Sequence, residues 1–202
     1  IGVGAIATVH ARAIADIEHA ELVAGVCRTQ EKGRAFAQET GCKWYDDYEQ
    51  MLEDEQPSIA TICTPSGAHL EPALSCARRG VHILCEKPLE ITSSRVDQMI
   101  RATEQAGITL GGIFPQRFNP VIQVIQQAAA AGRFGNLAVL NGYVPWWRDD
   151  AYYQTGRWQG TMALDGGGAL MNQAIHVVDA MTWIAASAMG LTREENPVEQ
   201  VF

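Results

Sequence analysis

The alternation of short apolar runs with helical patterns over the first hundred residues most constrains how this chain can fold. Strands are predicted at residues 1–4, 21–27, 58–64, 81–86 and 108–114. Helices are predicted between and after them, at residues 5–17, 30–41, 44–54, 69–80 and 92–107. Such alternation predicts parallel strands joined by right-handed helical crossovers, which is a doubly wound α/β sheet.

The pattern changes close to residue 116. A helix is predicted at 119–132, a strand at 136–144, a loop rich in aromatic residues at 145–158, and one long amphipathic helix at 166–185. We therefore expect two domains, at residues 1–116 and 117–202. Almost nothing precedes Gly2 in the first strand, and the last seven residues begin a strand-like pattern. These two features predict that the chain is incomplete.

Composition argues against several classes of partner. The net charge is −8 and no basic stripe is present, so nucleic acid is not an expected partner. No apolar run approaches the roughly 20 residues that a membrane span requires, so no membrane association is expected. The five cysteines are scattered and form no CxxC pair, which favours a reducing cytoplasm over a disulfide framework or a cysteine zinc site.

The first candidate motif is the glycine pattern G-x-G-x-x-A that starts at Gly2 and continues through Gly4, Ala5 and Ile6. Its glycines let the backbone turn tightly and approach a pyrophosphate at the N-terminus of the following helix. A simple tight turn is the alternative interpretation. A predicted strand before the motif and a helix after it favour the dinucleotide site.

The second predicted strand ends at the position where NAD-binding proteins usually carry an acid for the adenosine ribose. This chain has Arg28 and Thr29 there instead. A guanidinium pairs well with a 2′-phosphate, so we expect NADP rather than NAD. A solvated Arg28 without a ligand is the alternative.

Two further strand ends carry polar residues. Thr64, Pro65 and Ser66 follow one strand, His69 opens the next helix, and the segment Glu86–Lys87–Pro88 ends the following strand. Ligands of open α/β sheets bind beyond the carboxyl ends of the strands. We therefore expect these segments and the glycine turn to face one crevice.

The second half contains a triple glycine followed by Asn172, His176 and Asp179. On one helix these three residues would share a face. The early turns of a helix disfavour an imidazolium, so His176 is expected to stay neutral and basic near pH 7. A structural histidine is the alternative. A metal site is a poor interpretation, because no second histidine or cysteine accompanies the set.

The loop at residues 145–158 combines aromatic rings with arginines, which suits a hydroxylated or anionic small molecule. Arg148, Arg157 and Trp158 are the candidate substrate contacts. Packing of the aromatic rings on a sheet is the alternative.

Taken in order, G-x-G-x-x-A, T-P-x-x-x-H, E-K-P and G-G-G-x-L-x-x-x-x-x-H-x-x-D resemble the Gfo/Idh/MocA oxidoreductases from Gly2 to about Trp183. The resemblance implies an N-terminal Rossmann domain and a C-terminal α+β domain on a large, mostly antiparallel sheet. It also implies a homodimer or homotetramer formed through that sheet.

The resemblance also implies roles for individual residues. Lys87 would contact the substrate hydroxyl and the nicotinamide region, and His176 would be the general base. Asn172 would bind the substrate, at a position where family members commonly carry an aspartate that orients the substrate and supports the base. It keeps the hydrogen bonding without the charge. Asp179 would be structural, and the peptide before Pro88 would be cis. The expected cofactor-binding residues are Gly2, Gly4, Ala5, Ile6, Arg28, Thr29, Thr64, Pro65, Ser66, His69, Glu86, Lys87 and Gln116.

These expectations define an NAD(P)-dependent dehydrogenase that acts on a secondary hydroxyl or carbonyl of a sugar, polyol or sugar derivative. Its active site would lie between the two domains. A dinucleotide-sensing regulator on the same fold is the alternative, although such proteins would be expected to lose the lysine or the histidine. Oxidation coupled to glycoside or ether cleavage is a third option.

Overall fold

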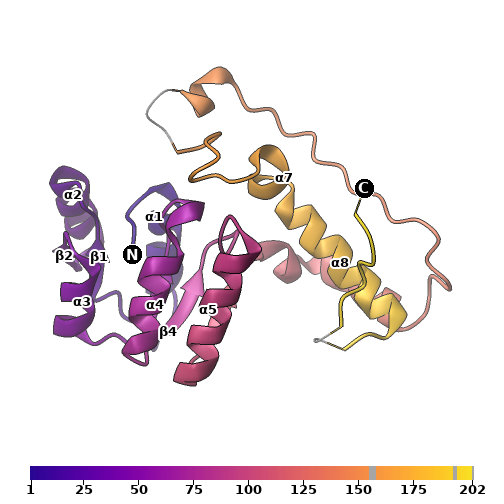
Figure 1. Ribbon diagram of the computed structural model, residues 1–202, viewed down its shortest axis with the longest axis horizontal. Coiled ribbons are helices and arrows are strands. Elements are labelled where there is room, and N and C mark those ends of the chain that lie inside the picture. The colour runs from indigo at the N-terminus through magenta and orange to yellow at the C-terminus, as the bar shows by residue number, and fades with distance from the viewer. Residues whose placement is uncertain (155–157, 193–194, 202) are drawn as a thin grey trace. The chain divides into compact units, whose positions relative to one another are not determined.

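The computed structural model of the protein describes residues 1–154, 158–192 and 195–201 (Figure 1). The chain divides into two units, and each is described by itself. The N-terminal unit comprises Ile1–Ile113 and Trp158–Gly166, and the C-terminal unit comprises Phe114–Arg157 and Gly167–Phe202. A short segment of the second half of the chain is therefore part of the first unit.

The N-terminal unit is built on parallel strands. These are β1 (Ala24–Val26), β2 (Lys43–Tyr45), β3 (Ile59–Ile62), β4 (His82–Cys85) and β5 (Leu110–Gly112). Strand β1 pairs with β2, and β4 lies between β3 and β5. The predicted parallel α/β sheet is confirmed.

The first two residues join the two groups of strands. The Gly2 N–H donates to the Val26 carbonyl at 2.9 Å, and the Cys63 N–H donates to the Ile1 carbonyl at 2.8 Å. The amino terminus of Ile1 donates to the Thr61 carbonyl at 2.6 Å. Residues 1–2 thus lie between β1 and β3, and the order becomes β2, β1, residues 1–2, β3, β4, β5. This is the strand order of the dinucleotide-binding fold.

The helices of this unit are α1 (Ala5–Ala15), α2 (Gln30–Thr40), α3 (Tyr48–Glu55), α4 (Leu70–Arg78) and α5 (Ser93–Ala106). Their ends follow the predicted signals. Gly41 and Gly107 terminate α2 and α5 in the left-handed conformation, with φ of 76° and 66°. The Thr92 side chain caps α5 by accepting from the Arg95 N–H.

One prediction in this unit is wrong. The sequence predicts a single helix over residues 44–54, but Trp44 and Tyr45 belong to strand β2 and the helix begins only at Tyr48. The Trp44 ring N–H donates to the Cys27 carbonyl at 3.0 Å. A three-residue strand is too short for its period to be read from the sequence, and tertiary contacts fix it instead.

Two groups of buried side chains form the core. The larger contains residues of β1, β3, β4, α3, α4 and α5, among them Ile62 and Met99. The smaller joins α1 to α2 through Ala7, Ala11 and Phe36. All five cysteines are free, and Cys63, Cys76 and Cys85 are buried as small apolar residues.

The C-terminal unit is helical where it has regular structure. It contains the short helices η2 (Pro115–Phe118) and η3 (Asp150–Tyr153) and the helices α6 (Pro120–Ala130), α7 (Gly168–Asn172) and α8 (Ile175–Met189). Helices α6 and α8 pack against each other. None of the described helices, in either unit, combines the length and hydropathy needed to cross a membrane.

Two predictions in this unit are wrong. The predicted strand at 136–144 is irregular, and no strand is found among the described residues of the unit. A strand needs a neighbour to pair with, whereas this segment packs on α8, with Gly142 close to Val177 and Met181.

The predicted long helix at 166–185 is instead two helices. The chain leaves α7 after Asn172 and enters α8 at Ile175, and the N–H groups of Gln173 and Ala174 both donate to the Ala169 carbonyl.

Replacement of Ile62 by alanine is expected to lower the free energy of unfolding by about 2–5 kcal/mol, because its side chain is fully buried and the cavity closes only partly. Ile59 lies in the same strand and is 60% exposed, so Ile59→Ala is the matched control and should cost less than about 1 kcal/mol. Urea unfolding followed by circular dichroism measures both. Equal losses would contradict this placement of the core.

Candidate active site

The turn from Gly2 into α1 has the geometry of an anion site. Gly2 has φ of +90°, and a Cβ there would lie 2.8 Å from the Cys63 carbonyl carbon and oxygen, so only glycine fits. Gly4 precedes α1 without a side-chain cap, and a Cβ at Gly4 would meet nothing within 4 Å. The first N–H groups of α1, at Ala5 and Ile6, lie at an exposed helix start. This open, uncapped turn fits a pyrophosphate.

The residues that follow β3 form a tight turn. Thr64 Oγ donates to the Ala68 carbonyl at 2.8 Å, and Pro65 leads into the short helix η1 (Ser66–Ala68). The Ser66 side chain is buried, so a ligand would meet mainly the backbone of this turn.

His69 is buried, with 1% of its surface exposed. One ring nitrogen lies 2.8 Å from the Thr64 carbonyl and the other 2.9 Å from the Pro88 carbonyl. The ring therefore ties the turn after β3 to the turn after β4, and it can act on a ligand only through these turns. The Lys87–Pro88 peptide is cis, which confirms the prediction.

Glu86 is buried at the end of β4 and is held on both carboxylate oxygens. His10 Nε2 of α1 lies 3.0 Å from Oε1, and the Lys87 N–H donates to Oε2 at 3.2 Å. Burial favours the neutral acid, but the hydrogen bonds from His10 and the Lys87 N–H outweigh it and lower the pKa of Glu86. The turn after β4 therefore carries a buried negative charge.

Lys87 is half-buried and interacts electrostatically with two acids, Glu86 and Asp165. Burial lowers the pKa of its ammonium below the ordinary value, whereas the charges of Glu86 and Asp165 act in the opposite direction. Asp165 is 1% exposed and accepts the Gly160 N–H at 2.7 Å. A buried carboxylate is costly unless it is paired or hydrogen-bonded, so its placement by Lys87 marks it as part of the site.

The segment 158–166 brings Asp165 to the N-terminal unit. The Gly67 N–H donates to the Leu164 carbonyl at 2.9 Å. A Cβ at Gly67 would lie 2.5 Å from the Ala163 carbonyl oxygen, so the two backbones meet where only glycine leaves room. Sequence reasoning missed Asp165. The available signal was an acid directly before a triple glycine.

Three other expected cofactor contacts lie outside the turns described above. Arg28 and Thr29 follow β1 and are exposed, and Thr29 precedes α2 without a side-chain cap bond. Gln116 lies in η2 of the C-terminal unit. Their contacts with a cofactor stay predictions.

The C-terminal unit carries the expected base. Asn172 is the last residue of α7 and is buried, whereas His176 is the second residue of α8. The prediction that both residues share one helix is wrong because the helix breaks between them. Asp179 accepts two hydrogen bonds from the Arg117 guanidinium, at 2.7 and 2.9 Å, and the guanidinium also lies over the Trp183 ring. These contacts agree with a structural Asp179.

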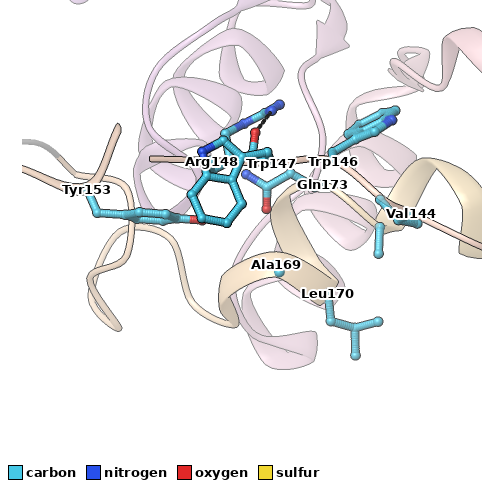
Figure 2. Close-up of a pocket in the computed structure, with 9 residues that line it drawn as sticks. Val144, Trp146, Trp147, Arg148, Tyr153, Ala169, Leu170 and Gln173 are labelled. Atoms are coloured by element: carbon cyan, nitrogen blue, oxygen red, sulfur yellow. Dashed lines mark hydrogen bonds between the residues drawn. The ribbon is translucent and has the colours of Figure 1, made fainter. Parts of the chain in front are cut away.

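A pocket of about 450 Å³ lies in the C-terminal unit. Its lining includes Trp146, Trp147, Arg148 and Tyr153 of the aromatic segment and Gln173 of the α7–α8 junction. Figure 2 shows Gln173 extending toward the aromatic segment. The Arg148 guanidinium lies over the rings of Trp146 and Tyr152.

Among the three expected substrate contacts, Arg148 lines this pocket. Trp158 belongs to the N-terminal unit, and Arg157 lies outside the described residues. Sequence reasoning missed Gln173, which no motif distinguishes.

Comparison with protein families gives two matches that together cover most of the chain. Residues 1–113 match the model of the oxidoreductase family with an NAD-binding Rossmann fold, GFO/IDH/MocA. Residues 122–197 match the model of the GFO/IDH/MocA C-terminal domain.

Individual relatives show how far the similarity extends. A myo-inositol 2-dehydrogenase from Thermotoga maritima is 31% identical over 69% of this chain and 42% of its own length. A D-glucoside 3-dehydrogenase from Escherichia coli is 28% identical over 91% of this chain and 52% of its own. The WlbA dehydrogenase from Bordetella pertussis, in complex with NADH and UDP-GlcNAcA, is 33% identical with a TM-score of 0.84, over 91% of this chain and 53% of its own. The chain spans about half the length of these relatives.

Proposed function

Because this chain belongs to the GFO/IDH/MocA oxidoreductase family with an NAD-binding Rossmann fold, we propose that it is an NAD(P)-dependent dehydrogenase. It transfers a hydride between the nicotinamide and a secondary hydroxyl or carbonyl of a sugar, polyol or sugar derivative. One observation carries the proposal. The uncapped start of α1 and the Glu86–Lys87–Pro88 turn lie at the carboxyl ends of strands in one parallel sheet, where such folds bind ligands.

In this proposal residues at those strand ends would hold the dinucleotide. Gly2, Gly4, Ala5 and Ile6 receive the pyrophosphate, and Arg28 with Thr29 receives the adenosine ribose and a 2′-phosphate. Backbone groups of Thr64, Pro65 and Ser66 line the middle of the cofactor, and His69 holds their turn. Glu86 and Lys87 would hold the nicotinamide end, and Gln116 is a further proposed cofactor contact. The nicotinamide supplies the hydride acceptor or donor when it is bound.

Lys87 acts on the reacting oxygen. Its ammonium donates a hydrogen bond to the substrate hydroxyl and stabilises the negative charge that develops there as hydride leaves the carbon. Partial burial strengthens this interaction, because fewer water molecules compete for the ammonium. Glu86 and Asp165 keep the lysine charged and oriented.

His176 takes the hydroxyl proton, and Asn172 orients the substrate through its amide. The first turn of α8 favours a neutral imidazole, which is the form that a base requires. Catalysis requires the base and the Lys87 ammonium to reach the same hydroxyl oxygen. Arg148, Arg157 and Trp158 contact the remainder of the substrate.

The substrate class is a cyclic polyhydroxy compound. The relatives named for myo-inositol and D-glucosides, and the WlbA complex with UDP-GlcNAcA, support this choice. The aromatic lining and Arg148 of the pocket suit such rings and their anionic derivatives.

We further propose domains at residues 1–116 and 117–202, with an antiparallel sheet in the second domain of the whole protein. We also propose a homodimer or homotetramer and a cytoplasmic location.

The choice between NADP and NAD is tested by fluorescence titration of the purified full-length protein with NADPH and NADH. We expect tighter binding of NADPH, because Arg28 follows β1 where no carboxylate is available. Arg28→Ala should weaken NADPH binding by about 10- to 100-fold and leave NADH binding unchanged. Tighter NADH binding by the unaltered protein would contradict the NADP choice and agree with the NADH in the WlbA complex.

The catalytic proposal is tested with Lys87→Met in a panel of inositols, aldoses and glycosides. We expect kcat to fall by about 10²- to 10³-fold while NADH still binds. Lys32→Met is the matched control, since Lys32 is an exposed lysine of α2, and it should keep full activity. Unchanged turnover in Lys87→Met would overturn the role of Lys87. Dinucleotide binding without turnover of any compound would favour the regulator.

A further inference from the structure

His10 links the helix of the proposed cofactor site to the turn after β4, which carries Lys87. It lies on α1, eight residues after Gly2, and its side chain is only 11% exposed. Its Nε2 is 3.0 Å from Glu86 Oε1, and its Nδ1 is 3.8 Å from the Cys63 sulfur. Cys63 follows β3 and Glu86 follows β4, so one ring contacts the ends of two neighbouring strands.

The Glu86 carboxylate transmits this contact to Lys87. One oxygen faces His10 and the other accepts the Lys87 N–H. The peptide from which the Lys87 side chain extends is thus fixed by a carboxylate that His10 holds. With His10 removed, Glu86 Oε1 would lose this partner and the carboxylate could turn toward the Lys87 ammonium.

We propose that His10 is a positioning residue of the active site, which holds Glu86 so that Lys87 keeps its place and its charge environment. The proposal rests on the dehydrogenase function for its kinetic consequence, but its structural part concerns only side chains of the N-terminal unit. The same helix would receive the pyrophosphate at its N-terminus, so α1 connects the cofactor site to the reacting end.

The charges around His10 support this role. Hydrogen bonds to the Cys63 sulfur and the Glu86 carboxylate raise the pKa of His10 to about 9. The raised pKa favours the imidazolium form of the ring, which can donate from both nitrogens. The titratable groups that face it are Cys63 and Glu86, and Lys87 and Asp165 lie beyond Glu86. A buried cation opposite Glu86 limits how strongly this carboxylate can stabilise the Lys87 ammonium.

Lys87 is one of three lysines in this sequence, with Lys32 and Lys43, and its resonance is identified as the one that is missing in Lys87→Met. Lysine labelled with ¹³C at Cε gives one resonance for each residue, and its pH titration reports the ionisation of each ammonium. We expect Lys87 to titrate below its ordinary range in the unaltered protein and at higher pH in His10→Ala. Loss of the imidazolium removes a nearby positive charge, and release of Glu86 lets its carboxylate turn toward the ammonium. Both changes raise the pKa of Lys87.

His10→Gln separates the hydrogen bond from the charge. The glutamine amide can still donate to Glu86, so kcat should stay close to that of the unaltered protein, whereas His10→Ala should lower kcat by about 10- to 100-fold with little change in NADH affinity. Val9→Ala is the matched control on the same helix, since Val9 is 56% exposed, and it should change neither property.

Two results would overturn the proposal. One is a folded His10→Ala protein with an unchanged Lys87 titration and unchanged kcat. The other is an equal loss of kcat in His10→Gln and His10→Ala. If His10→Ala does not fold, as judged by circular dichroism, an unshifted Lys87 titration in His10→Gln together with unchanged kcat in Glu86→Gln would overturn the proposal. A failure of the dehydrogenase function is distinguishable, because the lysine titration needs neither cofactor nor substrate.

Discussion

The backbone of Ile1 and Gly2 is the constraint on which the rest of the N-terminal unit depends. Its hydrogen bonds to Val26, Thr61 and Cys63 join β1 and β2 to the other three strands. Because Gly2 has no Cβ, the chain can pass beside the Cys63 carbonyl and turn directly into α1. The same two residues thus complete the sheet and create the exposed helix start that suits a pyrophosphate.

Buried charge around Lys87 is the second constraint. Glu86 and Asp165 are both buried, and each accepts a backbone N–H in addition to its interactions with side chains. Such charges cost stability unless their hydrogen bonds are satisfied. The charges of Glu86 and Asp165 favour the ammonium form of the half-buried Lys87, against the effect of its burial. His69 and the two turns that it joins give this arrangement a rigid support.

Sequence reasoning found the parts of the fold that rest on local signals. The glycine stops at Gly41 and Gly107 and the cap at Thr92 set helix ends through contacts within a few residues. Strand β2 and the break after Asn172 could not be found in this way. Strand β2 is fixed by its backbone pairing with β1. At the break, the N–H groups of Gln173 and Ala174 share the Ala169 carbonyl, and the hydrophobic periodicity does not reveal this. The irregular segment 136–144 has the composition of a strand but no partner among the described residues.

The residues of the candidate site also fall into two groups: those that sequence signals predict and those that only the structure brings together. Gly2, Glu86 and Lys87 could be predicted, because motif spacing and strand order place them at one edge of a sheet. Their roles stay predictions. His10 could not be predicted, because its contact with Glu86 joins residues that are far apart in the sequence. Asp165 was missed although it precedes a triple glycine, because its interaction with Lys87 is equally distant in the sequence.

A crystal structure of the full-length protein with NADH tests the central claim most directly. We expect the pyrophosphate against the N–H groups of Ala5 and Ile6 and the nicotinamide beside Glu86 and Lys87. A dinucleotide bound away from both the start of α1 and Lys87 would contradict it.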